Sequence, residues 1–312
     1  MNVVLMGSVS SSWHALDALV RGGVTVTGVL GVHESQADRI GDFRSLRERA
    51  GDAGIPFHAF VKVGESAVAS FIESKSPDML WVIGLSQLVP DRLIRLANHG
   101  GVGFHPTMLP EGRGRAPVAW TILLNARAAA TLFYLCDEPD AGDIIVQREV
   151  PVKPDDYSED LIHRTNLVLG EAVLELAPRL QSNDLPRTPQ DHSKATFYKK
   201  RTPADGLIDW SASTDCVYRL IRAAGRPYPG AFTYIAERKL TVWRAQPADD
   251  SSVDHDADAG RVIAIDQAQG VLVATADAGV WLTEVDVQHG GSACDVLAVG
   301  DRLMSDARSP KR

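Results

Sequence analysis

The sequence predicts an α/β protein with a doubly wound, Rossmann-like and mostly parallel sheet, followed by a smaller domain built from a helix and an OB-like β-barrel. Short apolar runs alternate with amphipathic stretches in the first half, and the run 79–83 is entirely apolar. Such uninterrupted apolar runs are typical of strands buried on both faces of a parallel sheet. Short strand-like segments separated by turn residues fill the last hundred residues. The length of 312 residues fits two domains.

Strands and helices are expected in turn along the first half, which is the pattern of βαβ units. In chain order we expect a strand at 2–6, a helix at 12–21, a strand at 24–30, a helix at 43–53, a strand at 55–58, a helix at 66–74 and a strand at 79–83. The glycines and prolines of residues 101–117 exclude a regular helix or a central strand, so an irregular loop is expected there.

The second half begins with a helix and two strands and ends with the expected barrel. In chain order we expect a helix at 117–125, strands at 131–135 and 144–150, a helix at 158–180, a helix at 214–224 and strands at 232–235, 240–245, 261–265, 271–276 and 280–285. The acidic run 249–258 is expected to be a solvated loop. We therefore expect a first domain at 1–190, a linker at 181–202 and a C-terminal domain at 203–305.

Composition excludes several classes of protein. Hydrophobic residues make up 45% of the chain and charged residues 23%, which is typical of a globular protein. No apolar run approaches the ~20 residues of a membrane span. The net charge of -8 disfavours binding to nucleic acid. Three widely spaced cysteines fit neither a disulfide framework nor a zinc site, and the start of the chain lacks an export signal, so a cytoplasmic protein without a metal is expected.

Two residues far apart in the sequence are candidates for acid–base chemistry. His105 is expected at the carboxyl end of a strand, where open α/β sheets bind their ligands. Asp140 lies in a glycine-containing turn between the strands expected at 131–135 and 144–150. Alone, either residue is more often structural. Together, on adjacent strands, a histidine and a carboxylate form a plausible proton-transfer pair.

At these residues the chain resembles the folate-dependent formyltransferases. The family signature is roughly Asn-x-His-x-Ser-Leu-Leu-Pro, then Arg-Gly-x-x-Pro, then Asp-x-Gly. The matching stretches here are His105, Thr107-Met-Leu-Pro110, Arg113-Gly-Arg-Ala-Pro117, Asp140-Ala-Gly142, Arg201-Thr-Pro-Ala-Asp-Gly-Leu-Ile-Asp-Trp210, Ile221-Arg-Ala and Arg226-Pro-Tyr-Pro-Gly-Ala-Phe232. The resemblance covers about 300 residues and is greatest to the branch that formylates amino sugars on nucleotide carriers, such as 4-amino-4-deoxy-arabinose linked to UDP.

The resemblance implies a reaction and a set of residues. It implies an N-formyltransferase that moves a formyl group from 10-formyltetrahydrofolate to the amine of a nucleotide-linked amino sugar, with residues 1–190 as the catalytic domain. His105 would relay protons, and Asp140 would stabilise its protonated ring. The implied folate-binding residues are Gln87, Leu88, Val89, Arg115, Cys136, Asp137, Glu138, Pro139 and Asp140. No metal is implied, and a homodimer formed through the second domain is an expectation.

One position departs from the family pattern. The family's asparagine, two residues before the histidine, is Gly103 here. Its carboxamide donates a hydrogen bond to the developing oxyanion, and losing such a donor costs about a hundredfold or more in turnover. Gln87 follows the expected strand 79–83, so we expect it at the same end of the sheet, where its carboxamide is a candidate replacement donor. Gln87 would act alone or with a bound water; the alternative is that Gln87 contacts only the pterin or solvent and protonated His105 stabilises the oxyanion unaided.

Other functions remain open at this stage. A weakened or altered reaction, a ligand-binding protein without turnover, and hydrolysis of formylfolate are consistent with Gly103. Methionyl-tRNA formyltransferase performs the same chemistry on a polyanion. Residues 205–312 carry 11 Lys and Arg against 16 Asp and Glu, and residues 33–49 lack the basic, glycine-rich insertion associated with the tRNA enzyme. These two features favour the amino-sugar branch.

Overall fold

The computed structural model describes residues 1–249 and 257–305, within which the chain forms two compact units. The first unit comprises Met1–Thr121, Arg127–Val152 and Leu161–Lys199, and the second comprises Ile122–Ala126, Lys153–Asp160 and Lys200–Arg312. Most of the acidic run 249–258 lies outside the described residues. Over the ranges that are described, no helix has the length and apolar character needed to cross a membrane.

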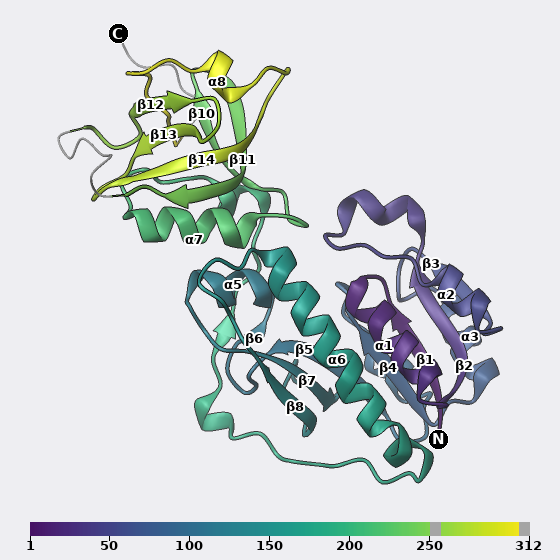
Figure 1. Ribbon diagram of the computed structural model, residues 1–312. Coiled ribbons are helices and arrows are strands. Elements are labelled where there is room, and N and C mark those ends of the chain that lie inside the picture. Colours follow the sequence, from purple (N-terminus) through teal and green to yellow (C-terminus); the bar gives the residue numbers. More distant parts are fainter. Residues whose placement is uncertain (250–256, 306–312) are drawn as a thin grey trace. The chain divides into compact units, whose positions relative to one another are not determined.

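The first unit is built on a seven-stranded sheet (Figure 1). In the order in which they lie side by side, its strands are β3 (Phe57–Phe60), β2 (Thr25–Val32), β1 (Asn2–Gly7), β4 (Met79–Ile83), β5 (Gly101–Thr107), β7 (Ala128–Tyr134) and β8 (Ile144–Val150). The first five are parallel, and β7 and β8 are antiparallel to their neighbours. The predicted doubly wound, mostly parallel sheet is confirmed.

The order of the strands determines where a ligand would bind. The chain runs outward from β1 to β3 and then returns to the other side of β1 to form β4, so the direction of winding changes between β1 and β4. Ligands of open α/β sheets bind at such a change, outside the carboxyl ends of the strands. The carboxyl end of β5, where His105 lies, is next to this crevice.

Helices cover both faces of the sheet. The helices of this region are α1 (Ser10–Arg21), α2 (Arg47–Asp52), α3 (Ser66–Lys75), α4 (Asp91–Ile94), α5 (Pro117–Leu123) and α6 (Ser158–Gln181), with short 3-10 helices at Glu34–Arg39 and His192–Lys194. The helix expected at 43–53 is limited to α2. Alternate residues of β1 explain the two layers: Val4 and Met6 pack in the cluster that contains Ile72 of α3, whereas Leu5, pointing the other way, is equally buried.

Strand β5 contradicts the expectation that residues 101–117 contain no central strand. It lies between β4 and β7 in spite of Gly101, Gly103 and Pro106. The side chains of Leu135 and Phe133 pack directly onto the two glycines. A Cβ at either position would overlap these side chains, so the absence of a side chain allows the close packing. The ladder with β7 shifts register around Pro106, which has no N–H to donate. Packing from another part of the sequence therefore overrides the local pattern.

The second unit contains a helix and a five-stranded antiparallel sheet (Figure 1). Its elements are a 3-10 helix (Pro203–Gly206), α7 (Thr214–Ala224), α8 (Ala293–Val296) and the strands, in spatial order, β10 (Ala231–Ile235), β11 (Arg238–Pro247), β14 (Gly279–Val287), β13 (Gly270–Ala274) and β12 (Val262–Asp266). Apolar residues of α7 and the sheet form one buried core, which includes Ile221, Leu240 and Val273. The sequence predicted a helix and an OB-like β-barrel here; the structure has the helix and five antiparallel strands, whose ladder does not close by itself.

A short segment at 300–304 joins the two edges of this sheet. Met304 exchanges two backbone hydrogen bonds with Tyr234 of the edge strand β10. At the other edge, Val262 of β12 donates to the carbonyl of Asp301 and accepts from the N–H of Gly300. The segment therefore satisfies backbone groups of both edge strands, which is the task that closure performs in a β-barrel.

Candidate active site

His105 is a buried residue whose ring is held by a loop carbonyl. It lies on β5 with 5% of its surface exposed, and its Nε2 is 2.8 Å from the carbonyl oxygen of Gly112. Because a carbonyl only accepts, the proton of the neutral ring must be on Nε2. Nδ1 is then the ring nitrogen that can take up a further proton.

Asp140 faces that nitrogen. Its Oδ2 lies 3.7 Å from Nδ1 of His105 and accepts a 2.8 Å hydrogen bond from the backbone N–H of Gly114. The residue has a φ of 58°, the left-handed conformation that aspartate tolerates better than most residues. The structure thus brings together the two residues that the sequence singled out, although 34 positions separate them. A proton taken up at Nδ1 lies beside a carboxylate, a geometry suited to acid–base chemistry.

A buried guanidinium organises the loop that carries Asp140. Arg113 is 1% exposed. It donates from Nη1 to Glu138 (3.1 Å), from Nη2 to Oε1 of Gln190 (2.8 Å) and to Nδ1 of His192 (3.1 Å), and from Nε to the same Gln190 oxygen (3.3 Å). The sequence motif contained Arg113 but implied no role for it. Gln190 was not singled out, because the polar composition around it indicated only a linker.

The implied folate-binding residues occupy two surface loops of the first unit, one after β4 and one between β7 and β8, except for Arg115, which follows the short strand β6 (Arg113–Gly114). Leu88 is 83% exposed, and Arg115, Cys136, Asp137, Glu138 and Pro139 are also exposed, whereas Val89 is half-buried against the core.

Gln87 lies in the first of these loops, and both ends of its carboxamide are occupied. Oε1 accepts a 2.9 Å hydrogen bond from the N–H of Val63, and Nε2 donates to the carbonyl of Val61, also at 2.9 Å. These contacts hold the loop after β4 against the segment that follows β3. The prediction that Gln87 donates to an oxyanion stays a prediction: the bond to Val61 uses one of the two N–H donors of its carboxamide.

The position of the family's asparagine is filled by an aromatic ring. A Cβ added to Gly103 would lie 2.7 Å from Cζ of Phe133 and 2.8 Å from Cδ2 of Leu135. Gly103 pairs with Phe133 across the β5–β7 ladder, two residues before His105 on the same face of the strand. The departure at Gly103 is therefore coupled to a bulky neighbour, and the surroundings of His105 are apolar on that side.

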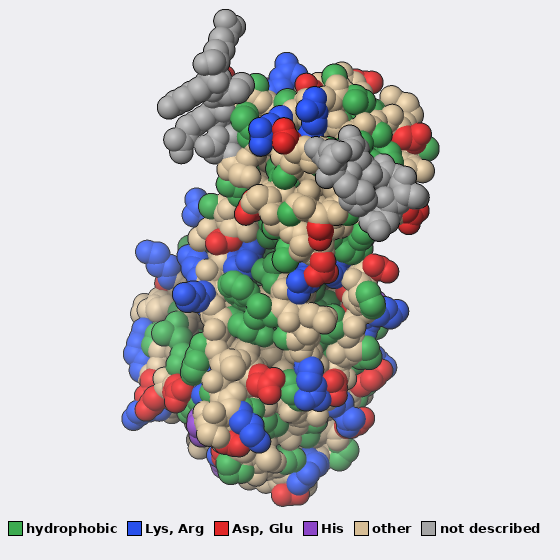
Figure 2. Space-filling view, turned by 90° about the vertical axis from the view of Figure 1, so that its left-hand side faces the viewer, with side chains coloured by type: hydrophobic (Ala, Val, Ile, Leu, Met, Phe, Trp, Pro, Cys, Tyr) green, Lys and Arg blue, Asp and Glu red, His purple; other side chains and the backbone are tan. Residues whose placement is uncertain are grey.

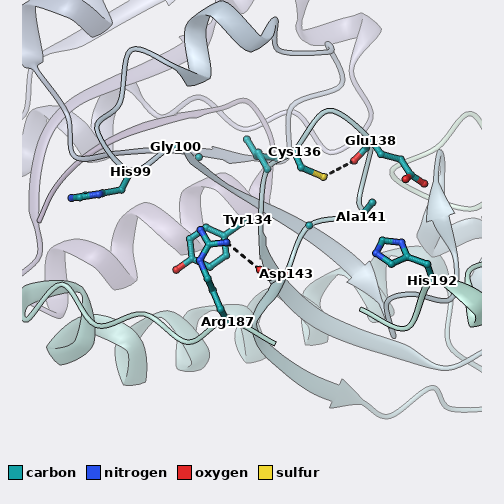
Figure 3. A pocket seen from close by; sticks show the side chains of 12 residues that line it. His99, Gly100, Tyr134, Cys136, Glu138, Ala141, Asp143, Arg187 and His192 are labelled. Carbon is teal, nitrogen blue, oxygen red and sulfur yellow. Dashed lines mark hydrogen bonds and ion pairs between the residues drawn. The ribbon is translucent and has the colours of Figure 1, made fainter. Parts of the chain in front are cut away.

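A cavity of about 470 Å³ lies near the amino end of β5 (Figure 3). Its lining residues are His99, Gly100, Gly101, Tyr134, Leu135, Cys136, Glu138, Ala141, Gly142, Asp143, Arg187 and His192. Neither His105 nor Asp140 is among them, although the loop between β7 and β8 contributes to its wall.

The charged groups of this cavity are largely paired with one another. Arg187 lies over the ring of Tyr134, 3.7 Å from its centroid, and pairs with Asp143 at 3.1 Å. Burial raises the pKa of the Tyr134 phenol, and Arg187 opposes this shift. Among the residues that the structure describes, no group of three or more His, Cys, Asp and Glu side chains is arranged to hold a metal ion.

Comparison with protein families gives two matches in chain order. A family model described as "Formyl transferase" matches residues 1–175, and one described as "Formyl transferase, C-terminal domain" matches residues 200–296. The two matches cover both units and include His105, Asp140 and Gly103.

Solved structures share the fold at low sequence identity. HypX from Aquifex aeolicus in complex with tetrahydrofolic acid is 18% identical with a TM-score of 0.68; the match covers 94% of this chain and 46% of HypX, so this chain spans less than half the length of HypX. A 4-N formyltransferase from Francisella tularensis is 18% identical (TM-score 0.60; 76% and 93% covered). An N-formyltransferase from Helicobacter canadensis in complex with folinic acid and dTDP-3-aminofucose is 12% identical (TM-score 0.61; 90% and 98% covered).

The close packing at Gly103 predicts a loss of stability when a side chain is added there. Gly103→Ala is expected to lower the free energy of unfolding by about 1–3 kcal/mol, since the new methyl group overlaps two buried side chains. Urea unfolding measures the change. Gly51→Ala is the control, because Gly51 lies in a helix with nothing within 4 Å of the added Cβ. A Gly103→Ala variant as stable as the wild type would contradict this account of the packing.

Proposed function

The chain belongs to the formyl transferase family, and we propose that it moves a formyl group from 10-formyltetrahydrofolate to the amine of a nucleotide-linked amino sugar. The observation that carries the proposal is the placement of Nδ1 of His105 beside the Asp140 carboxylate, at the end of the sheet where such folds bind ligands. Structural relatives that hold tetrahydrofolic acid, or folinic acid with dTDP-3-aminofucose, support the choice of substrates.

The reaction needs one proton relay and one stabilised oxyanion. The amine nitrogen attacks the formyl carbon, the bond from that carbon to N10 breaks, and one proton passes from the amine to N10. His105 takes that proton at Nδ1 and returns it, while Asp140 stabilises the protonated ring. The carbonyl of Gly112 holds the ring by its Nε2–H throughout.

The two loops assigned to folate support the choice of the formyl donor. Leu88 presents an exposed apolar side chain on the first loop, which suits a flat ring, and residues 136–139 of the second loop are exposed as well. A cytoplasmic location is part of the proposal, supported by free thiols at all three cysteines. The homodimer stays a prediction of the sequence.

Charge favours a sugar nucleotide over tRNA. Residues 205–312 carry 11 basic and 16 acidic side chains. On the face shown in Figure 2, described basic side chains lie among acidic and apolar ones and form no continuous basic surface. Proteins that bind long polyanions depend on such a surface, because neutralising phosphates supplies most of the binding energy.

Substrate class is tested with a panel of acceptors. The protein is incubated with 10-formyltetrahydrofolate and dTDP-, UDP- or GDP-linked amino sugars, or with charged initiator tRNA, and products are read by mass spectrometry. Formylation of at least one sugar and none of tRNA is expected, at about 50 mM and about 200 mM salt. Efficient formylation of tRNA that weakens steeply with salt would instead support the tRNA enzyme, and folate binding without any product would support a protein that has lost turnover.

Removing either member of the proton relay should abolish most turnover. His105→Asn and Asp140→Asn are each expected to lower kcat by about 10²- to 10⁴-fold, because each removes a group that holds or stabilises the transferred proton. Circular dichroism checks that both variants fold. Asp143→Asn is the matched control: it lies three residues further along the same loop and pairs with Arg187, so near-normal turnover is expected. Full activity in either relay variant would refute the assigned roles.

Gln87 distinguishes two sources of oxyanion stabilisation. Its hydrogen bonds to Val61 and Val63 favour a role in positioning the folate loop. Gln87→Ala should then raise the KM for the folate and leave kcat within a few-fold, and Gln87→Glu should do the same because it loses the donor to Val61. A fall in kcat of about a hundredfold at unchanged KM would show that Gln87 donates to the oxyanion in place of the missing asparagine.

A further inference from the structure

Gln190 is a buried carboxamide that touches the loop of Asp140 without being part of it. It lies in the polar segment after α6, and only 6% of its surface is exposed. Its Nε2 donates to the carbonyl of Asp140 at 2.8 Å and to the carbonyl of Gly142 at 2.7 Å. Its Oε1 accepts two hydrogen bonds from Arg113. One side chain thus ties the Asp140 loop to a buried guanidinium.

The orientation of this carboxamide follows from its neighbours. A guanidinium has only donors, so the oxygen of Gln190 must face Arg113. The NH₂ group is then turned toward the two loop carbonyls, which only accept. Arg113 is itself held by Glu138 and His192, which stops the pair from rotating together. The side chain therefore has one satisfied orientation, and its donors are directed at the loop.

The loop needs this restraint. Asp140 has a φ of 58°, a left-handed conformation that residues other than glycine adopt only when their surroundings hold them there. Buried carbonyls that lose their partner are also costly. Without Gln190 the loop would be free to relax toward backbone conformations in which the Asp140 carboxylate no longer lies between Nδ1 of His105 and the N–H of Gly114.

We propose that Gln190 is a positioning residue for the formyl transfer: by bonding the carbonyls of Asp140 and Gly142, it holds the Asp140 carboxylate at Nδ1 of His105. The inference rests on the proposed function for its catalytic meaning. The ordering of the Asp140 loop by Gln190 does not depend on the reaction, and hydrogen exchange measures it without substrate. Gln190 acts through Asp140, so its effect must disappear when the carboxylate of Asp140 is absent.

The key variant is Gln190→Glu, which keeps the size and shape of the side chain. It retains an oxygen to accept from Arg113 but has no NH₂ group, so both loop carbonyls lose their donor. A second variant, Gln190→Met, removes the donors without placing a charge beside these carbonyls, and a loss shared by both variants is not caused by that charge. Gln181→Glu is the matched control, because the amide of Gln181, the last residue of α6, also donates to two backbone carbonyls, but to those of Gly22 and Gly23 in the turn after α1 and not to the Asp140 loop.

Kinetics test the positioning role with an acceptor found in the substrate panel. Gln190→Glu and Gln190→Met are expected to lower kcat by about 10- to 100-fold, the usual cost of a misplaced catalytic group. In the Asp140→Asn background the same substitutions should cause no further loss, whereas Gln181→Glu should be silent in both backgrounds. An equal loss in both backgrounds would mean a general structural role and would overturn the proposal.

Hydrogen exchange separates this inference from the proposed function. The backbone amides of residues 136–138 and 140–143 should exchange faster in both Gln190 variants than in the wild type or in Gln181→Glu, with no substrate present. If the wild type transfers formyl to no acceptor but the loop loses protection, the proposed reaction is wrong and the ordering by Gln190 holds. If protection is unchanged in both variants, Gln190 does not order the loop and the inference is overturned whatever the activity.

Discussion

The burial of one positive charge shapes the whole candidate site. Arg113 is almost completely removed from water, and a buried guanidinium is tolerated only when its donors are satisfied. Its partners come from two places that are distant in sequence: Glu138 in the loop between β7 and β8, and Gln190 and His192 in the segment after α6. The hydrogen bonds that satisfy this charge therefore hold the segment after α6 against the loop that carries Asp140. The backbone follows, since Arg113–Gly114 pairs with Phe197–Tyr198 as the short strands β6 and β9.

Runs of apolar residues in the sequence predicted those strands whose burial depends on their own side chains. Strand β4 was expected from five consecutive apolar residues, and the structure buries that run between two layers of helices. A strand ending at His105 was expected, but a central position for β5 was excluded, because its glycines argue against it until Phe133 and Leu135, some thirty residues further on, are placed over them. The contact between Arg113 and Gln190 spans 77 residues, and nothing in the polar stretch around Gln190 distinguishes it from a linker. Hydrophobic periodicity reports which face is buried, but it carries no information about which polar partner a buried group will find.

Some features of the candidate site could likewise be predicted from the sequence, and others could not. The order of motifs along the chain led to His105 and Asp140, and the structure places them together because β5 and β7 are neighbours and the loop after β7 folds back toward β5. Motif order did not reveal that the carboxamide of Gln87 would be occupied by Val61 and Val63, or that Phe133 would occupy the space beside Gly103. Both are matters of side-chain packing, which a pattern of residue types does not specify.

Gly103 and Phe133 together remove a hydrogen-bond donor for the reacting carbonyl and make this side of the site apolar. A carboxamide at position 103 would donate directly to an oxyanion, whereas the ring of Phe133 donates nothing and lowers the local polarity. In a less polar environment each remaining charge interacts more strongly with its neighbours. On the proposed reaction, the proton that His105 takes from the amine is one candidate for stabilising the developing oxyanion, and the carboxamide of Gln87 is the other. If His105 rather than Gln87 supplies that stabilisation, the same proton serves both the transfer and the oxyanion, and the position of the Asp140 carboxylate then governs both steps.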